Sequence, residues 1–166
     1  MIKYKAVKID LIEYNNAFNL QKILQQKVLN DNSEQYILYL QHTNVITTGK
    51  RGFQDNLKFE ESYYLNNNIS LVQTDRGGLA TYHGPGQLVV YFIVNLNDLN
   101  LGIKAFVNKI EDIIITILQK LNITAYKNDE YRGVFVENDK ICAIGMQVTH
   151  NITTHGIALN VNTNLQ

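Results

Sequence analysis

Apolar residues recur along this chain at two spacings, one typical of helices and the other of strands. From Ile103 to Leu121 they return every three or four positions, which predicts one long amphipathic helix. The same spacing predicts a second helix over Ala17–Leu29 and a short one over Phe59–Leu65. Runs of β-branched and aromatic residues predict strands at Lys5–Asp10, Tyr36–Leu40, Val45–Thr48, Ile69–Gln73, Leu88–Asn95, Val134–Val136, Ile141–Val148 and Gly156–Val161.

The order of these elements predicts an α/β fold. Val134–Val136 and Ile141–Val148 flank the short bend Glu137–Lys140 and should form a hairpin. Strands with a few helices between them are typical of a mixed β-sheet covered by helices. The chain of 166 residues has the length of one domain, and no Pro-, Gly- or Ser-rich linker divides it. We therefore expect a single domain over residues 1–166.

Composition narrows the class of partner. Fifteen basic residues balance fifteen acidic ones, which argues against binding to nucleic acid or to an anionic membrane surface. The longest apolar runs are too short to span a bilayer, and the first ten residues lack the apolar core of a signal peptide. The one cysteine, Cys142, cannot form an internal disulfide. A reducing, cytoplasmic location is the simplest expectation.

A glycine-rich segment, RGGLATYHGPGQ at Arg76–Gln87, is the most informative stretch. Four glycines in twelve residues predict a loop that turns tightly or lies close to another group. Arg76 and His83 add a cation and a titratable ring to it. The segment lacks the Gly-Lys-Ser/Thr of a nucleotide-binding P-loop and the GxGxxG of a dinucleotide site. The alternative is a hairpin or bulge that happens to carry a histidine.

Two other stretches combine apolar strands with small residues. They are KICAIG at Lys140–Gly145 and HGIALN at His155–Asn160. In a regular strand Lys140 and Cys142 point to one face, and a lysine beside a thiol lowers the thiol's pKa. The residues alone favour the simpler alternative, in which Cys142 is a small buried side chain and Lys140 a solvated hairpin residue. His42 is a weaker candidate, because a lone histidine is more often structural.

Three blocks of sequence carry a family resemblance. RGGLATYHGPGQLVVYFIVNL (Arg76–Leu96), GVFVENDKICAIGMQV (Gly133–Val148) and THGIALNVNTNL (Thr154–Leu165) resemble the signature blocks of lipoyl(octanoyl) transferases, in the same order. HTNVITTGKRG (His42–Gly52) resembles an earlier block, with Thr43–Asn44 in place of prolines. The resemblance implies a fold like that of the catalytic domain of biotin and lipoate protein ligases.

The resemblance also implies an activity. Such a protein transfers octanoate from octanoyl-acyl carrier protein to a lysine of apo lipoyl domains, in 2-oxoacid dehydrogenase subunits and the glycine cleavage H protein. The reaction is the first step of protein lipoylation and uses no ATP, metal or other cofactor. By motif, Lys140 lowers the pKa of a catalytic cysteine. The implied acyl site comprises Arg76, Gly77, Gly78, Leu79, Ala80, Thr81, Tyr82, His83, Ala143, Ile144, Gly145, Gly156, Ile157 and Ala158.

The sequence departs from the family pattern at its end. In the family the nucleophilic cysteine follows the last block in a Pro-Cys-Gly segment, and the printed sequence stops at Gln166. We expect a sequence truncated at its C-terminus; the alternatives are a natural degenerate copy and a substitute role for Cys142. Lys50, Arg51 and Arg76 are candidates for a local patch that meets acidic carriers. Two other functions remain open: an adenylating lipoate or biotin ligase, and a non-catalytic binder of acyl groups or lipoyl domains.

Overall fold

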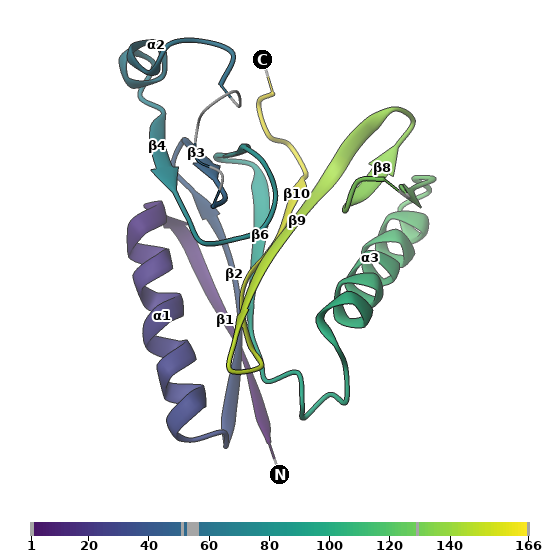
Figure 1. The fold of residues 1–166 in the computed structure, drawn as a ribbon. Helices are drawn as coiled ribbons and strands as arrows, with labels where there is room; N and C mark the ends of the chain where they lie inside the picture. Colours follow the sequence, from purple (N-terminus) through teal and green to yellow (C-terminus); the bar gives the residue numbers. More distant parts are fainter. Residues whose placement is uncertain (1, 51, 53–56, 129, 166) are drawn as a thin grey trace.

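The computed structural model describes residues 2–50, 52, 57–128 and 130–165. Its main sheet has seven strands among these residues (Figure 1), in the order β1 (Lys3–Ile12), β2 (Glu34–His42), β6 (Gln87–Ile93), β10 (Ile152–Asn160), β9 (Asp139–Thr149), β8 (Val134–Val136) and β7 (Tyr126–Lys127). β1 runs parallel to β2, and the other neighbours are antiparallel. A smaller sheet holds β4 (Ser70–Gln73), β3 (Val45–Thr48) and β5 (Thr81–His83).

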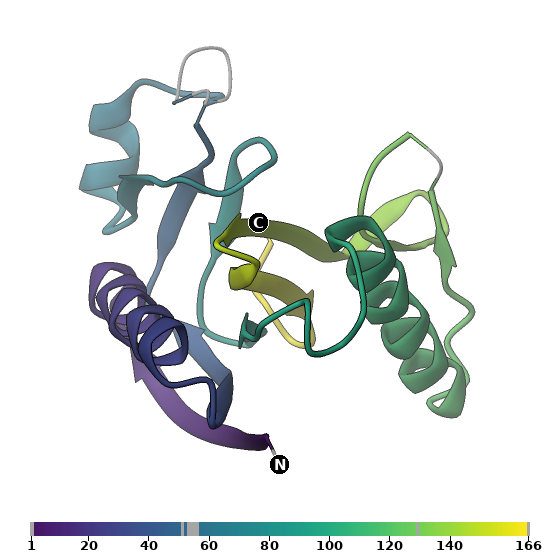
Figure 2. The same cartoon turned by 60° about the horizontal axis from the view of Figure 1, so that its bottom comes forward.

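Two long helices cover opposite faces of the main sheet (Figure 1 and Figure 2). α1 (Tyr14–Asn30) packs on one face and α3 (Ile103–Lys120) on the other, while the short α2 (Glu61–Asn66) lies beside β4. The alternation along β6 divides its side chains between the two cores. Val89 and Tyr91 join the α1 core, whereas Val90 and Phe92 pack against the α3 core. The predicted α/β class, a mixed sheet covered by helices, is confirmed.

Helix α3 follows its sequence pattern closely. Ile110 and Ile114 are 5% and 6% exposed and pack in the α3 core with Leu118. The apolar stripe is wider than the buried face, because Ile113 and Ile117 remain about half exposed. Within the described residues, no helix has both the length and the apolar character that crossing a membrane requires.

The central hairpin β9–β10 differs most from the sequence prediction. β10 begins at Ile152, four residues before the predicted strand, because Ile152 and the polar run Thr153–His155 are buried in the sheet. A two-residue turn joins the strands, with His150 and Asn151 both in the left-handed region at φ 51° and 61°. Thr153 Oγ1 donates to Phe92 O at 2.6 Å, whereas the buried Thr154 Oγ1 has no hydrogen-bond partner within the described residues. β5 and β7 were also not predicted.

Candidate functional site

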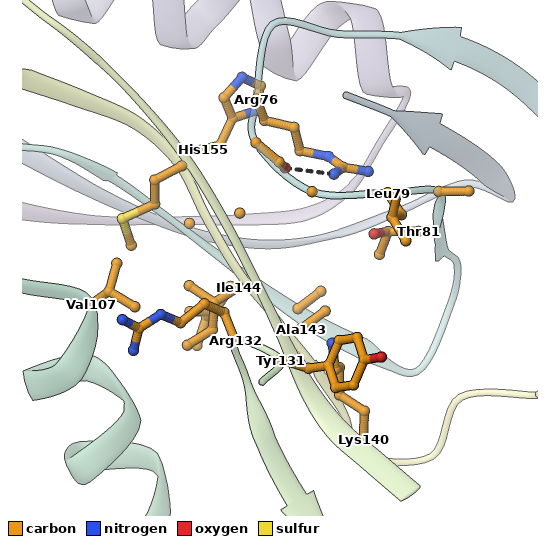
Figure 3. Close-up of a pocket in the computed structure, with 18 of the residues that line it drawn as sticks. Arg76, Leu79, Thr81, Val107, Tyr131, Arg132, Lys140, Ala143, Ile144 and His155 are labelled. Atoms are coloured by element: carbon orange, nitrogen blue, oxygen red, sulfur yellow. Dashed lines mark hydrogen bonds between the residues drawn. The ribbon is translucent and has the colours of Figure 1, made fainter. Parts of the chain in front are cut away.

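A cleft of about 850 Å³ lies between the glycine-rich loop, the hairpin β9–β10 and the N-terminal half of α3 (Figure 3). Every residue that the motifs assign to the acyl site lines this cleft except Tyr82, and Lys140 lines it too. The predicted lining residues that the structure brings together are Arg76, Gly77, Gly78, Leu79, Ala80, Thr81, His83, Lys140, Ala143, Ile144, Gly145, Gly156, Ile157 and Ala158.

Tyr82 is the exception because of strand alternation. Residues 81–83 form β5, so Thr81 and His83 reach the cleft from one side of the strand and Tyr82 points away. The Tyr82 hydroxyl donates to Asn44 Oδ1 at 3.0 Å instead. The expected loop is therefore a strand at this point.

The glycine-rich loop lies directly on the hairpin, and glycines at the contact make this possible. Gly145 and Gly156 pair across β9 and β10. A Cβ atom on Gly145 would be 3.1 Å from Gly77 O, and one on Gly156 would be 2.0 Å from Val90 O. The glycine-rich loop also packs closely on Gly49, because a Cβ atom at that position would lie 2.6 Å from Gly78 O. Side chains at Gly49 and Gly145 would push the glycine-rich loop away from its neighbours, and one at Gly156 would push β10 away from β6.

Arg76 fastens the loop to the small sheet. Its Nη2 donates to Thr47 O at 2.7 Å and its Nη1 to Gly77 O at 2.9 Å. The side chain is buried, at 6% exposure, so its guanidinium cannot belong to the surface patch expected with Lys50. Lys50 itself is exposed. Arg51, the third member of that patch, lies outside the described residues.

One end of the cleft is polar. His155 Nε2 donates to Asp75 Oδ1 at 2.8 Å, and Lys22 Nζ donates to Asp75 Oδ2 at 2.5 Å. The His155 bond, followed by that of Lys22, holds the pKa of Asp75 well below its usual range. Burial lowers the pKa of His155, so its Nδ1 is free to accept from the Tyr14 hydroxyl at 3.4 Å.

His83 occupies the same end as a neutral ring. Its Nδ1 donates to Gln87 Oε1 at 2.7 Å, and Nε2 lies 3.3 Å from Thr47 Oγ1. Burial lowers its pKa to about 3. His42 is fully buried behind it, bonded to Ile12 O at 2.9 Å and to the Tyr91 hydroxyl at 2.7 Å, and is not among the described lining residues. The sequence made His42 the weaker site candidate, and its buried place outside the cleft lining is consistent with a structural role.

Lys140 lies at the opposite end of the cleft from Arg76 and His155 (Figure 3). Partial burial lowers its pKa, and its Nζ sits 5.2 Å from the centre of the Phe135 ring. Cys142 is fully buried in the α3 core, where burial raises its pKa to about 12. A β-bulge in β9 between these two residues interrupts the alternation on which the same-face expectation rested. The buried-side-chain alternative for Cys142 is confirmed.

Several lining residues were missed by the sequence analysis. Tyr14, Tyr91 and His155 form the polar end, and His155 was quoted in HGIALN without a site role. The others are contributed by α3, by β9 and by the segment before β8: Ile103, Lys104, Val107, Glu130, Tyr131, Arg132 and Met146. No local motif marks Tyr14 or the α3 residues, because only the fold brings them to the cleft.

Comparison with solved structures confirms the expected fold. Lipoate-protein ligase A bound with ATP superposes with a TM-score of 0.79 at 15% sequence identity, over 99% of this chain and 69% of that one. The archaeal bipartite lipoate protein ligase of Thermoplasma acidophilum gives a TM-score of 0.76 at 14% identity, over 99% of this chain and 64% of that one. At these identities the likeness concerns the fold.

Sequence relatives are much closer. The octanoyltransferase of Alkaliphilus metalliredigens is 40% identical over 161 residues, covering 96% of this chain and 74% of the relative. That of Caldicellulosiruptor saccharolyticus is 39% identical over 167 residues, covering 99% and 71%. Residues 13–166 match the model of the lipoyl protein ligase A/B catalytic domain. The chain belongs to this catalytic-domain family and, within it, to the octanoyltransferases, as its motifs predicted.

Proposed function

We propose that this chain transfers an octanoyl group from octanoyl-acyl carrier protein to a lysine of apo lipoyl domains. The observation that carries the proposal is the cleft itself. It joins an apolar wall to a lysine of lowered pKa in a chain whose relatives are octanoyltransferases. We place the reaction in the cytoplasm, with lipoyl domains of 2-oxoacid dehydrogenases and the glycine cleavage H protein as acceptors.

The cleft wall suits a straight acyl chain. Four apolar lining residues come from the adjacent strands β9 and β10: the paired Ala143 and Ala158 face the α1 side of the sheet, and the paired Ile144 and Ile157 face the α3 side. Gly145 and Gly156 between them leave the backbone itself as the surface. A fatty acyl chain gains free energy by leaving water for such a wall, at about 25 cal/mol per Å² of apolar area. The octanoyl chain would extend from the Lys140 end towards the polar end.

Lys140 suits the two proton transfers that the reaction needs. In the first step a thiolate attacks the octanoyl carbonyl, a new thioester bond forms, and the carrier's thiolate leaves and takes a proton from the Lys140 ammonium. In the second step the acceptor lysine's neutral amine attacks that thioester. The amide bond forms, the thiolate leaves, and the amine's proton returns to Lys140. A lysine with a lowered pKa exchanges protons more readily near neutral pH.

Cys142 does not suit the role of the attacking thiol. It is fully buried, its pKa is raised, and it is not among the described residues that line the cleft. The printed sequence holds one cysteine. We therefore assign the attacking thiol to a residue outside these 166 positions. Three cations near the cleft could attract an acidic carrier protein, namely Lys104, Arg132 and Lys140.

The test mixes octanoyl-acyl carrier protein and an apo lipoyl domain with two proteins. One is this chain, and the other is a version extended through the reading frame beyond Gln166. We expect the extended protein to add one octanoyl group to the lipoyl domain, measured by mass spectrometry, and Lys140→Ala to slow it. A hydroxylamine-sensitive octanoyl adduct on Cys142 would overturn the assignment of the thiol. ATP–pyrophosphate exchange in place of carrier-dependent transfer would support an adenylating ligase.

A further inference from the structure

Helix α3 carries a carboxylate into the protein interior. Glu111 is 1% exposed and faces the turn that leads into β8. The Gly133 amide donates to its Oε1 at 3.1 Å. Its Oε2 lies 3.6 Å from Arg132 Nη1 and, within the described residues, has no hydrogen-bond partner. Burying a charged group generally costs several kcal/mol of folding free energy. A glutamate on the buried face of a helix is therefore unfavourable unless its carboxylate serves the neighbouring turn.

The turn held by Glu111 supports Lys140. Gly133 has φ +131°, and a Cβ atom there would lie 3.2 Å from Lys140 Cδ and 3.3 Å from Lys140 Cε. The methylene stem of the lysine therefore rests directly on the Gly133 backbone. The ring of Phe135, opposite Lys140 in the β8–β9 pairing, lies beside the ammonium group.

The same helix face holds the segment just before Gly133. Arg132 Nη1 donates to Asn108 Oδ1 at 2.8 Å, one helical turn before Glu111. Arg132 and Tyr131 reach the cleft wall from this segment, and Figure 3 shows Tyr131 next to Lys140. Glu111 thus contacts a stretch of chain that both lines the cleft near Lys140 and supports the methylene stem of that lysine.

We propose that Glu111 is a positioning residue for the transfer reaction. Its carboxylate fixes segment 130–133, and the Gly133 backbone in turn fixes the Lys140 side chain at the cleft. The inference rests on the proposed function in one respect, namely that Lys140 exchanges protons with the reacting groups. A purely structural role for Glu111 would affect folding stability and leave the environment of the Lys140 ammonium unchanged.

The test observes Lys140 directly and requires no substrate. Reductive methylation with ¹³C-formaldehyde labels the lysines, and the signal lost in Lys140→Arg identifies Lys140. The variants are Glu111→Met, which removes the acceptor for Gly133, and Glu111→Gln, which keeps an amide oxygen there. Asp112→Asn is the matched control, because Asp112 is exposed on the same helix and pairs with Lys127 at 2.6 Å.

Partial burial lowers the pKa of Lys140 in the parent. We expect its NMR titration midpoint to move up towards that of a solvated lysine in Glu111→Met, and to stay near the parent value in Glu111→Gln and Asp112→Asn. In the extended protein, Glu111→Met should lower kcat more than it raises KM. An unchanged Lys140 midpoint in a folded Glu111→Met variant would overturn the proposal, as would an equal shift in Glu111→Gln.

A second measurement covers the case in which Glu111→Met does not fold. In the parent and in Glu111→Gln we expect nuclear Overhauser contacts between the labelled Lys140 methyl groups and Gly133 Hα. Their absence would overturn the proposal without any destabilised variant. Loss of octanoyl transfer in the extended parent would instead count against the proposed function, so the two failures are distinguishable.

Discussion

His155 Nε2 donates to Asp75 Oδ1 at 2.8 Å, and this bond joins the central strand β10 to the residue before the glycine-rich loop. The backbone of His155 is in the left-handed region, with φ 59°, and its amide donates to Gln21 Oε1 at 2.7 Å. Helix α1 thereby holds the His155 backbone, and Asp75 holds its ring. The polar end of the cleft is built from groups that are satisfied within the fold.

Buried histidines predict how folding stability depends on pH. Burial lowers the pKa values of His42, His83 and His155 below the unfolded value of about 6.5. Their protonation therefore favours unfolding, so the stability is fully present above about pH 6.5 and is lost as pH falls below it. His83, whose folded pKa of about 3 lies well below that window, contributes a slope of up to about 1.4 kcal/mol per pH unit, and His42 and His155 add to it in the same direction.

Urea unfolding at a series of pH values from 7.5 to about 5 measures this slope. We expect a steady decrease in the free energy of unfolding over that range. Equal stability at both ends would mean that the three rings are not buried as described.

The stability of glycine-to-alanine variants should distinguish a closely packed glycine from one with room for a side chain. In Gly156→Ala the new methyl group would meet Val90 O and the ring of Phe92. We expect a loss of about 3 kcal/mol or more. Gly77→Ala is the control, because the nearest atom to its Cβ is Met146 O at 3.8 Å, an ordinary contact. Thermal unfolding should place Gly77→Ala near the parent and Gly156→Ala well below it; the reverse order would contradict the close packing of β10 against β6.

The face of α3 can be tested with a matched pair of isoleucines. Ile110→Asp places a carboxylate at a position 5% exposed, which should cost several kcal/mol. Ile113→Asp puts the same group at a position 56% exposed and should change stability little. Chemical denaturation of both variants gives the comparison. Similar losses in the two proteins would show that the helix packs through a different face.

His42 and His83, whose ring centres lie 5.7 Å apart, predict different defects. His83 lines the cleft, so His83→Ala should weaken the binding of octanoyl thioesters. His42 is buried between Ile12 O and the Tyr91 hydroxyl, so His42→Ala should mainly lower the melting temperature. Calorimetric titration with octanoyl-pantetheine and a thermal melt of each variant separate the effects. Stronger loss of binding in His42→Ala would reverse the site assignment.

Sequence reasoning succeeded where a local pattern determines the structure. The periodicity of α3 placed Ile110 in the core, and the motif blocks located most of the wall that the glycine-rich loop and the hairpin β9–β10 contribute to the cleft. It failed where tertiary context overrides local preference. The run Thr153–His155 is polar but central in the sheet, and Tyr14 reaches the cleft through the packing of α1. The bulge that separates Lys140 from Cys142 also has no signal in a single sequence.

In the proposed reaction the octanoyl chain lies on the β9–β10 wall, with its carbonyl end near Lys140. Methyl-resolved NMR during titration with octanoyl-pantetheine tests this most directly. The methyl signals of Ala143, Ile144 and Ala158 should shift on binding, whereas those of Ile23, exposed on α1, should not. Unshifted cleft methyls at saturating ligand, or equal shifts at Ile23, would contradict the claim.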